Sequence, residues 1–217
     1  MMIAVFWVSL LSLVYIYFGY PLLVLFLAKK GVAVNRETDY APQVSILIAA
    51  FNEEDEIETT LYNKLEQRYP AEKMQILVVS DESTDSTDDI VRRIAAESDI
   101  PIKLIRQVPR AGKTSGLNLL VPETSGEIIV FSDANSLWGE NTLAKLVENF
   151  SDPAVGYVTG KMIYTNPDGS VIGDGCSSFM KYENWLREKE TACGSIVGVD
   201  GGVDAMRKSL YSPLRRD

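Results

Sequence analysis

The sequence contains no histidine and only two cysteines, Cys176 and Cys193, among its 217 residues. The absence of histidine excludes a catalytic triad built on His. Because the two cysteines are isolated and form no Cys-x-x-Cys pair, a structural zinc site is excluded as well. Two cysteines in a chain predicted below to face a reducing compartment are expected to be free thiols.

The usual signatures of phosphate binding are incomplete. Ala111-Gly112-Lys113-Thr114 resembles the end of a P-loop, but Gln107 stands where that motif requires its first glycine. No Gly-x-Gly-x-x-Gly follows the first predicted strand, so a dinucleotide-binding Rossmann domain lacks its phosphate cradle. The net charge of −9 argues against a nucleic acid partner, which requires a basic surface.

Residues 1–28 contain no charged side chain. This apolar run is longer than the roughly 20 residues needed to cross the hydrocarbon core of a bilayer, so we expect a transmembrane anchor. A cleaved secretory signal is the competing interpretation. The run lacks a basic start, is long for a signal and is not followed by a small-x-small cleavage site, and these features favour a retained anchor.

The charges that flank the anchor predict its orientation. Lys29, Lys30 and Arg36 follow the span, whereas no lysine or arginine precedes it. The positive-inside rule therefore places the rest of the chain in the cytoplasm, anchored to the cell (inner) membrane. Residues 29–43 are predicted to be a linker, and residues 44–217 a single domain.

Four apolar runs in that domain are typical of buried strands, and they alternate with helical patterns. The runs are Val44–Ala50, Met74–Ser80, Ile100–Ile105 and the stretch 127–131. Asn52, with Asp55 three residues later, has the spacing of a helix N-cap. Alternation of this kind predicts an α/β fold, a mostly parallel Rossmann-like sheet with helices on both faces.

Polar side chains follow three of these strands directly. Residues 51–54 follow the first strand, Asp81 the second, and Asp133 and Asn135 the fourth. Ligands bind at the carboxyl ends of the strands in open α/β sheets, so these groups are expected to share one crevice. A carboxylate and a second oxygen two residues later suit Mg²⁺ or Mn²⁺, although an Asp/Asn turn is the simpler interpretation of that segment alone.

Five segments in this order resemble the membrane-associated family 2 glycosyltransferases, which have the GT-A fold. They are Val44–Glu54, Val79–Asp85, Gly112–Asn118, Phe131–Asn135 and Gly201–Arg207. The resemblance covers about residues 44 to 211. It implies an inverting, metal-dependent enzyme that takes a sugar from a nucleotide-sugar, most plausibly a UDP-sugar, and gives it to a polysaccharide or lipid-linked acceptor at the cytoplasmic membrane face.

The resemblance also implies a role for the end of the first strand and for the residue that follows the second. The segment that contains Ala49, Phe51 and Glu53 would pack around the base and ribose of the donor. Asp81 would accept a hydrogen bond from the uracil ring, and an ionised carboxylate, which only accepts, suits the imide N–H.

The remaining implied roles concern the diphosphate. Asp133 and Asn135 match the metal-holding Asp-x-Asp, with an amide in the second position that brings less charge to the metal. Lys113 and Arg207 are candidates to assist in neutralising the departing nucleoside diphosphate.

The resemblance assigns no catalytic residue within the chain. The family's general base lies in an acidic pair downstream of the last matching segment, so it is expected beyond Asp217, and the chain is interpreted as a fragment or truncated homologue of a longer enzyme. The alternative is a non-catalytic nucleotide-sugar-binding module or pseudoenzyme. A nucleotidyltransferase is a third possibility, but no glycine-rich loop follows the first strand.

Overall fold

The computed structural model describes the chain except for residues 30, 32, 162–173, 200 and 214–217. Two compact units are present. One contains Met1–Ala33 and Ile163–Val199, and the other contains Val34–Met162 and Asp200–Asp217. The segment between residues 163 and 199 thus groups with the N-terminal helix and not with the sheet.

The larger unit is built on a six-stranded sheet in the order β3-β2-β1-β4-β6-β5. Strands β1 (Val44–Ala50), β2 (Met74–Ser80), β3 (Ile102–Arg106) and β4 (Ile128–Asp133) are parallel, as predicted. Strand β6 (Val203–Arg207) runs antiparallel to both β4 and β5 (Tyr157–Thr159). Because β6 is reversed, its first residue lies at the edge where the parallel strands end.

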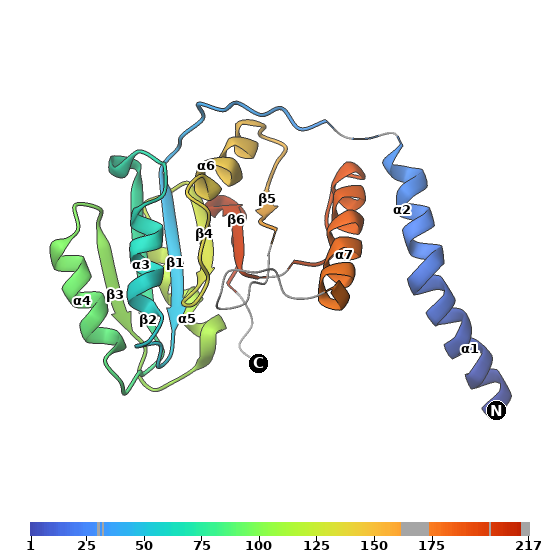
Figure 1. Cartoon of the computed structure of the whole chain (residues 1–217), viewed down its shortest axis with the longest axis horizontal. Helices are drawn as coiled ribbons and strands as arrows, with labels where there is room; N and C mark the ends of the chain where they lie inside the picture. The colour runs from blue at the N-terminus through green and yellow to red at the C-terminus, as the bar shows by residue number, and fades with distance from the viewer. Residues whose placement is uncertain (30, 32, 162–173, 200, 214–217) are drawn as a thin grey trace. The chain divides into compact units, whose positions relative to one another are not determined.

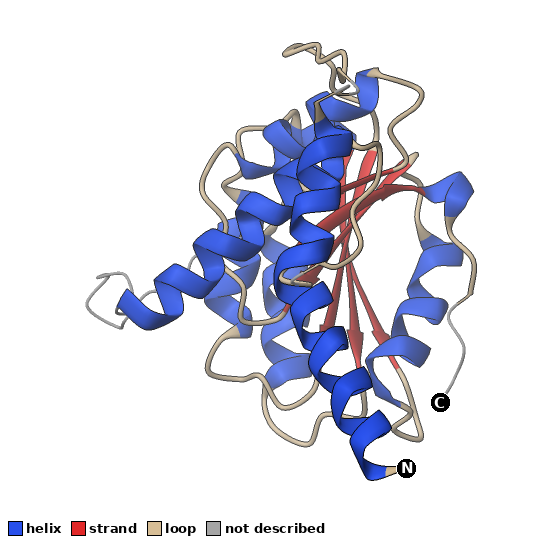
Figure 2. Cartoon of the chain, turned by 90° about the vertical axis from the view of Figure 1, so that its right-hand side faces the viewer, coloured by secondary structure: helices blue, strands red, loops and turns tan. Residues whose placement is uncertain are grey.

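Alternating side chains of the strands make two apolar cores, one on each face of the sheet. On one face, Ile46 and Ile48 pack with α3 (Ile57–Leu65), α4 (Thr87–Glu97) and α6 (Thr142–Val147). On the other face, Leu47 packs with α5 (Gly112–Leu120) and the 3₁₀ turn Val121–Glu123. Figure 1 and Figure 2 show these helices on both sides of the strands, which confirms the predicted layered architecture.

In the smaller unit, α1 (Met2–Val14), a π-helical stretch (Tyr15–Gly19) and α2 (Tyr20–Ala28) form one helix over Met2–Ala28. It is 27 residues long, with a mean hydropathy of 2.1, and is long and apolar enough to cross a membrane. Helix α7 (Asp174–Ala192) contacts α2, and the hydroxyl of Tyr20 donates to Glu190 Oε1 at 2.5 Å.

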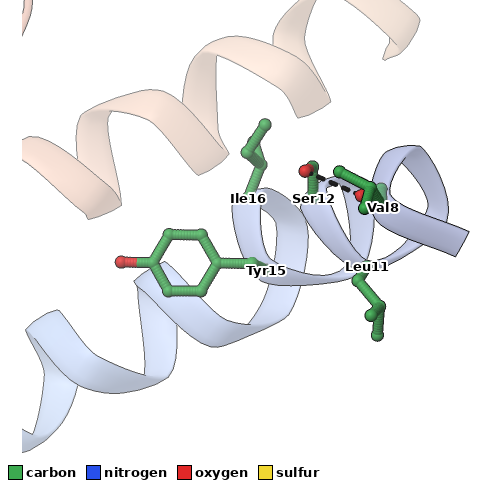
Figure 3. Close-up of a pocket in the computed structure, with 5 residues that line it drawn as sticks. All are labelled: Val8, Leu11, Ser12, Tyr15 and Ile16. Atoms are coloured by element: carbon green, nitrogen blue, oxygen red, sulfur yellow. Dashed lines mark hydrogen bonds between the residues drawn. The ribbon is translucent and has the colours of Figure 1, made fainter. Parts of the chain in front are cut away.

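Figure 3 shows a shallow hollow on the N-terminal helix, lined by the largely apolar set Val8, Leu11, Ser12, Tyr15 and Ile16.

The predicted N-cap at Asn52 is wrong. Helix α3 begins at Ile57, after the cap residue Glu56, and no side chain caps it. Asn52 instead adopts a positive φ of 53° in the turn after β1. Asparagine is tolerated in this left-handed region because its short polar side chain bonds locally, and the bond that it makes here reaches the neighbouring turn.

Candidate functional site

Asp81 is the most strongly held carboxylate at the carboxyl edge of the sheet. It is buried directly after β2, and its Oδ1 accepts hydrogen bonds from the backbone N–H of Ala111 at 2.9 Å and from Gln107 Nε2. Its Oδ2 accepts from the N–H of Gly112 at 3.0 Å and lies 3.5 Å from Arg110 Nε. Burial alone would raise the pKa of Asp81, but these donors outweigh it, so the pKa lies below its ordinary value.

Arg110 approaches both the aromatic ring of Phe51 and the carboxylate of Asp81. The guanidinium carbon of Arg110 is 3.5 Å from the centroid of the Phe51 ring, a cation–π contact. The same guanidinium approaches Asp81, and the N–H of Arg110 donates to Glu82 Oε2 at 2.8 Å. The loop between β3 and α5 therefore brings a cation over an aromatic face and a buried carboxylate at the end of β2.

The turns that follow β1 and β2 hold each other in place. Both begin with left-handed residues, Asn52 with φ 53° and Glu82 with φ 60°. Asn52 Oδ1 accepts from the N–H of Thr84 at 2.8 Å, and the N–H of Glu53 donates to Thr87 Oγ1 at 2.8 Å. Such backbone conformations persist only where surrounding bonds enforce them, and they concentrate at functional sites.

Asp133 ends β4 at the same edge. Its strand partner in β1 is Ala49, and Lys113 Nζ forms an ion pair with its Oδ1. The pKa of Glu53 reflects its burial and the negative charges that gather at this edge. Burial raises the pKa of its carboxyl, and the negative charges of Glu56, Asp133 and Asp85 raise it further. The edge therefore contains more carboxylates than cations.

Helix α5 delivers Lys113 because two glycines shape its first turns. Gly112 has a φ of +84°, which other residues rarely adopt, and its N–H points to Asp81. A Cβ on Gly116 would lie 2.8 Å from Cγ1 of Val79, so the missing side chain lets α5 pack closely on β2. The pattern Gly-Lys-x-x-Gly thus places a cation between the carboxyl ends of β2 and β4.

A divalent cation could bind at this edge only if substrate phosphates or water supplied some of its ligands. Asp133 is partly exposed and Asn135 is exposed, and Lys113 forms an ion pair with one carboxylate oxygen of Asp133. Among the described residues, no group of three His, Cys, Asp or Glu could by itself hold a metal. Mg²⁺ and Mn²⁺ sites commonly combine one or two protein oxygens with substrate phosphates and water, and Asp133 with Asn135 matches that pattern.

The structure brings together the predicted residues Ala49, Phe51, Glu53, Asp81, Lys113, Asp133 and Asn135 at one edge of the sheet. Arg207 is the exception, and its predicted role at the diphosphate is wrong. It pairs with Ile128, at the opposite end of β4 from Asp133. Its guanidinium donates to the carbonyls of Val155, Phe150 and Asp152, so it stabilises the far edge of the sheet. Asp217 lies outside the described residues.

Sequence reasoning missed Gln107 and Arg110 as members of the site. Gln107 is buried and its amide donates to Asp81, although in the sequence it stands out only as the residue that interrupts a P-loop motif. The available signal was position: both residues follow β3, whose carboxyl end lies at the same edge as those of β1, β2 and β4.

A protein-family model described as Glycosyl transferase family 2 matches residues 45–212. The chain is 32% identical over 169 residues to a beta-monoglucosyldiacylglycerol synthase of Nostoc sp., covering 77% of this chain and 36% of that protein. It is 26% identical over 196 residues to a poly-beta-1,6-N-acetyl-D-glucosamine synthase of Staphylococcus aureus, covering 89% and 46%. The chain thus spans between a third and a half of the length of these curated relatives.

Among solved structures, the chain resembles a mannosyltransferase from Pyrobaculum calidifontis in complex with GDP-Man and Mn²⁺. The two share 32% sequence identity with a TM-score of 0.76, and the match covers 92% of this chain and 55% of that one.

Proposed function

Since the chain belongs to glycosyl transferase family 2, we propose that it forms the donor-binding part of an inverting, metal-dependent glycosyltransferase. The proposed donor is a nucleotide-sugar, by preference a UDP-sugar. The proposed acceptor is a polysaccharide or a lipid-linked glycan at the cytoplasmic face of the cell membrane. Family membership supports glycosyl transfer as the reaction, and the choice of donor, acceptor and membrane face is our inference.

The observation that carries the proposal is the convergence of Asp81, Lys113 and Asp133 at the carboxyl edge of the sheet. Asp81 is a carboxylate acceptor, which suits a base that carries a ring N–H. The Arg110 guanidinium that approaches it also lies over the ring of Phe51. Lys113 and Asp133 lie where a diphosphate and its counter-ion can be bound. The residues thus provide separate positions for a base and for a charged phosphate group.

A bound Mg²⁺ or Mn²⁺ would supply Lewis-acid stabilisation of the charge that develops on the departing nucleoside diphosphate. Asp133 and Asn135 are the proposed protein ligands, and Lys113 would add positive charge near the same phosphates. The solved relative that contains Mn²⁺ and GDP-Man supports a metal-bound nucleotide-sugar, and it makes GDP the nucleotide to compare with UDP.

The membrane part of the proposal rests on the N-terminal helix. Its 27 residues contain no charged side chain and suffice for a span, and the basic residues that follow it favour a cytoplasmic sheet domain. Two relatives, a beta-monoglucosyldiacylglycerol synthase and a poly-beta-1,6-N-acetyl-D-glucosamine synthase, support a lipid or glycan acceptor without deciding between them.

Calorimetric titration of the full chain in detergent micelles tests the donor assignment. UDP and GDP are each titrated with and without Mn²⁺, and we expect base-selective binding that Mn²⁺ tightens. Asp133→Asn preserves the shape of the side chain and removes its charge, so it should abolish the effect of Mn²⁺. Asp89→Asn is the matched control, since Asp89 is an exposed carboxylate on α4 that forms an ion pair with its helix neighbour Arg92.

The proposal fails if the folded wild-type chain binds neither nucleotide, or if Asp133→Asn retains the full effect of Mn²⁺. Binding of a nucleotide-sugar without its hydrolysis or transfer would favour the alternative of a nucleotide-sugar-binding module. A preference for GDP would keep the site and correct the donor.

A further inference from the structure

Lys64 of α3 is completely buried, with 0% of its surface exposed. Lysine is almost never fully buried unless it is paired with an opposite charge. Among the residues that the structure describes, no carboxylate lies within ion-pair distance of Lys64. Burial lowers its pKa to about 7. A buried apolar residue would fill this space without that cost, so the ammonium group requires an explanation.

The contacts of the Lys64 ammonium group point to one segment. Nζ donates to the carbonyl of Ser136 and to Asn63 Oδ1 at 3.1 Å, and it lies 4.3 Å from the centroid of the Trp138 ring. A protonated lysine has three N–H donors, and two oxygens and one aromatic face are available to them. Two of these three acceptors belong to the segment that follows Asp133 and Asn135.

Residues close to Lys64 on α3 form hydrogen bonds with the backbone of the same segment. The Asn63 side chain accepts from the N–H of Trp138 at 2.8 Å and donates to its carbonyl at 2.8 Å. Gln67 accepts from the N–H of Leu143 at 3.1 Å. One face of α3 therefore fixes the connection from β4 to α6 at several points.

Ser136 is also held from the other side. Its hydroxyl donates to the carbonyl of Gly202, just before β6, at 3.0 Å. Its carbonyl, which accepts from Lys64, belongs to the residue directly after Asn135. This carbonyl lies in the peptide that joins Ser136 to Leu137. The bond from Lys64 and the bond to Gly202 together fix the backbone immediately after Asn135, and so restrict the conformation of the segment that carries the proposed second metal ligand.

We propose that Lys64 is a positioning residue that holds the segment Asp133–Ser136 in the conformation that binds the metal–diphosphate group. This inference deepens the proposed function and rests on it. Lys64 touches neither donor nor metal and acts through the Ser136 carbonyl and the Trp138 ring. Its removal is therefore expected to reduce metal-assisted nucleotide binding more than binding of the nucleotide alone.

The test compares Lys64→Met with Lys73→Met in the full chain. Methionine has a similar length and no donors. Lys73 is a matched control, since its Nζ also donates to a backbone carbonyl, that of Ala41 at 2.6 Å, but just before β2, at the opposite end of the sheet. The measured quantity is the dissociation constant of UDP without Mn²⁺ divided by that with Mn²⁺. If the wild type prefers GDP, the same ratio is measured with GDP.

We expect Lys64→Met to reduce this ratio about tenfold, the effect of losing one hydrogen bond to a charged donor. The metal-free dissociation constant should stay within about twofold of wild type, because the base contacts are at β1 and β2. Lys73→Met should behave as wild type. A wild-type ratio in Lys64→Met overturns the inference. A wild-type chain without any effect of Mn²⁺ overturns the proposed function and this inference with it.

If Lys64→Met does not fold, Trp138→Phe provides the same test with a smaller change. Trp138 Nε1 has no hydrogen-bond partner in the described part of the chain, so phenylalanine removes little except part of the ring beneath the ammonium group. A severalfold lower ratio in this variant supports the inference, and an unchanged ratio overturns it.

Discussion

The ammonium group of Lys113 forms an ion pair with Asp133, and so joins the first turn of α5 to the end of β4. The two residues lie twenty positions apart, and both are partly exposed. In this arrangement the lysine covers the carboxylate oxygen that is proposed to bind a metal. The lysine and a divalent cation would therefore compete for one oxygen, whereas a diphosphate could bind both.

Lys113→Met is expected to have opposite effects on the two ligands. Mn²⁺ should bind the nucleotide-free chain severalfold more tightly, because the competing ammonium group is gone. UDP with Mn²⁺ should bind about tenfold more weakly, because a charged donor to the diphosphate is lost. Titrations of both ligands measure this. Lys103→Met removes the exposed ion pair between Lys103, on the edge strand β3, and Glu123. It should change neither dissociation constant.

Asp81→Ala is expected to weaken UDP more than CDP. The uracil ring offers an N–H to an acceptor carboxylate, whereas the same position of cytosine is itself an acceptor, so only UDP loses a hydrogen bond. The expected difference is about tenfold in dissociation constant, as for a hydrogen bond to a charged group. Competition titrations with the two nucleotides check it, and equal losses would contradict a role for Asp81 in base recognition.

Substitutions at Asn52 separate backbone strain from hydrogen bonding. Asn52→Gly keeps the positive φ accessible but loses the bond from Thr84, and Asn52→Ala loses both. The free energy of unfolding should therefore decrease in the order wild type, glycine, alanine, with about 1 kcal/mol between the two variants. Urea denaturation of the chain in micelles measures the order, and an alanine variant as stable as the glycine variant would show that the turn is not strained.

Lys64 makes stability depend on pH. Its pKa is about 7 in the folded chain, and burial is the cause, against 10.5 for an ordinary lysine. Between these values the unfolded chain binds more protons than the folded one, so the free energy of unfolding should rise with pH, by at most about 1.4 kcal/mol per unit. Denaturation at pH 7 to 10 tests this against Lys64→Met, in which the slope from this group should vanish.

The predicted strands β1, β2 and β4 were recovered because each combines an apolar run with burial on both faces, whereas β3 is only partly buried and begins two residues later than predicted. Val44–Ala50 and Met74–Ser80 coincide with β1 and β2 as predicted. The convergence of Asp81 and Asp133 followed from the rule that parallel strands end at one edge. This much of the site depended only on local sequence and on strand order.

The rest of the site depended on contacts between distant segments. Asn52 has the spacing of a helix cap, but its side chain bonds across to Thr84, thirty-two residues away. Lys64 lies seven residues after Ile57 and three after Leu61, on the buried face of α3, but its position alone does not reveal that the segment after β4 encloses its charge. Arg207 was assigned to the wrong edge because the reversed direction of β6 is not apparent from its composition. A pattern within one segment of the sequence does not indicate which distant segments that segment will contact.

The reversed strand β6 also determines where the chain leaves the sheet. Strand β5 ends and β6 begins at the same edge, where the N–H of Gly160 donates to the carbonyl of Val203 at 2.8 Å. The two ends of the connection between β5 and β6 are therefore held side by side, so the strand register does not depend on the length of that connection. A change in the length or sequence of this connection would leave the strand register unaltered. A chimeric enzyme could therefore be made by joining the corresponding segment of a relative at these two points.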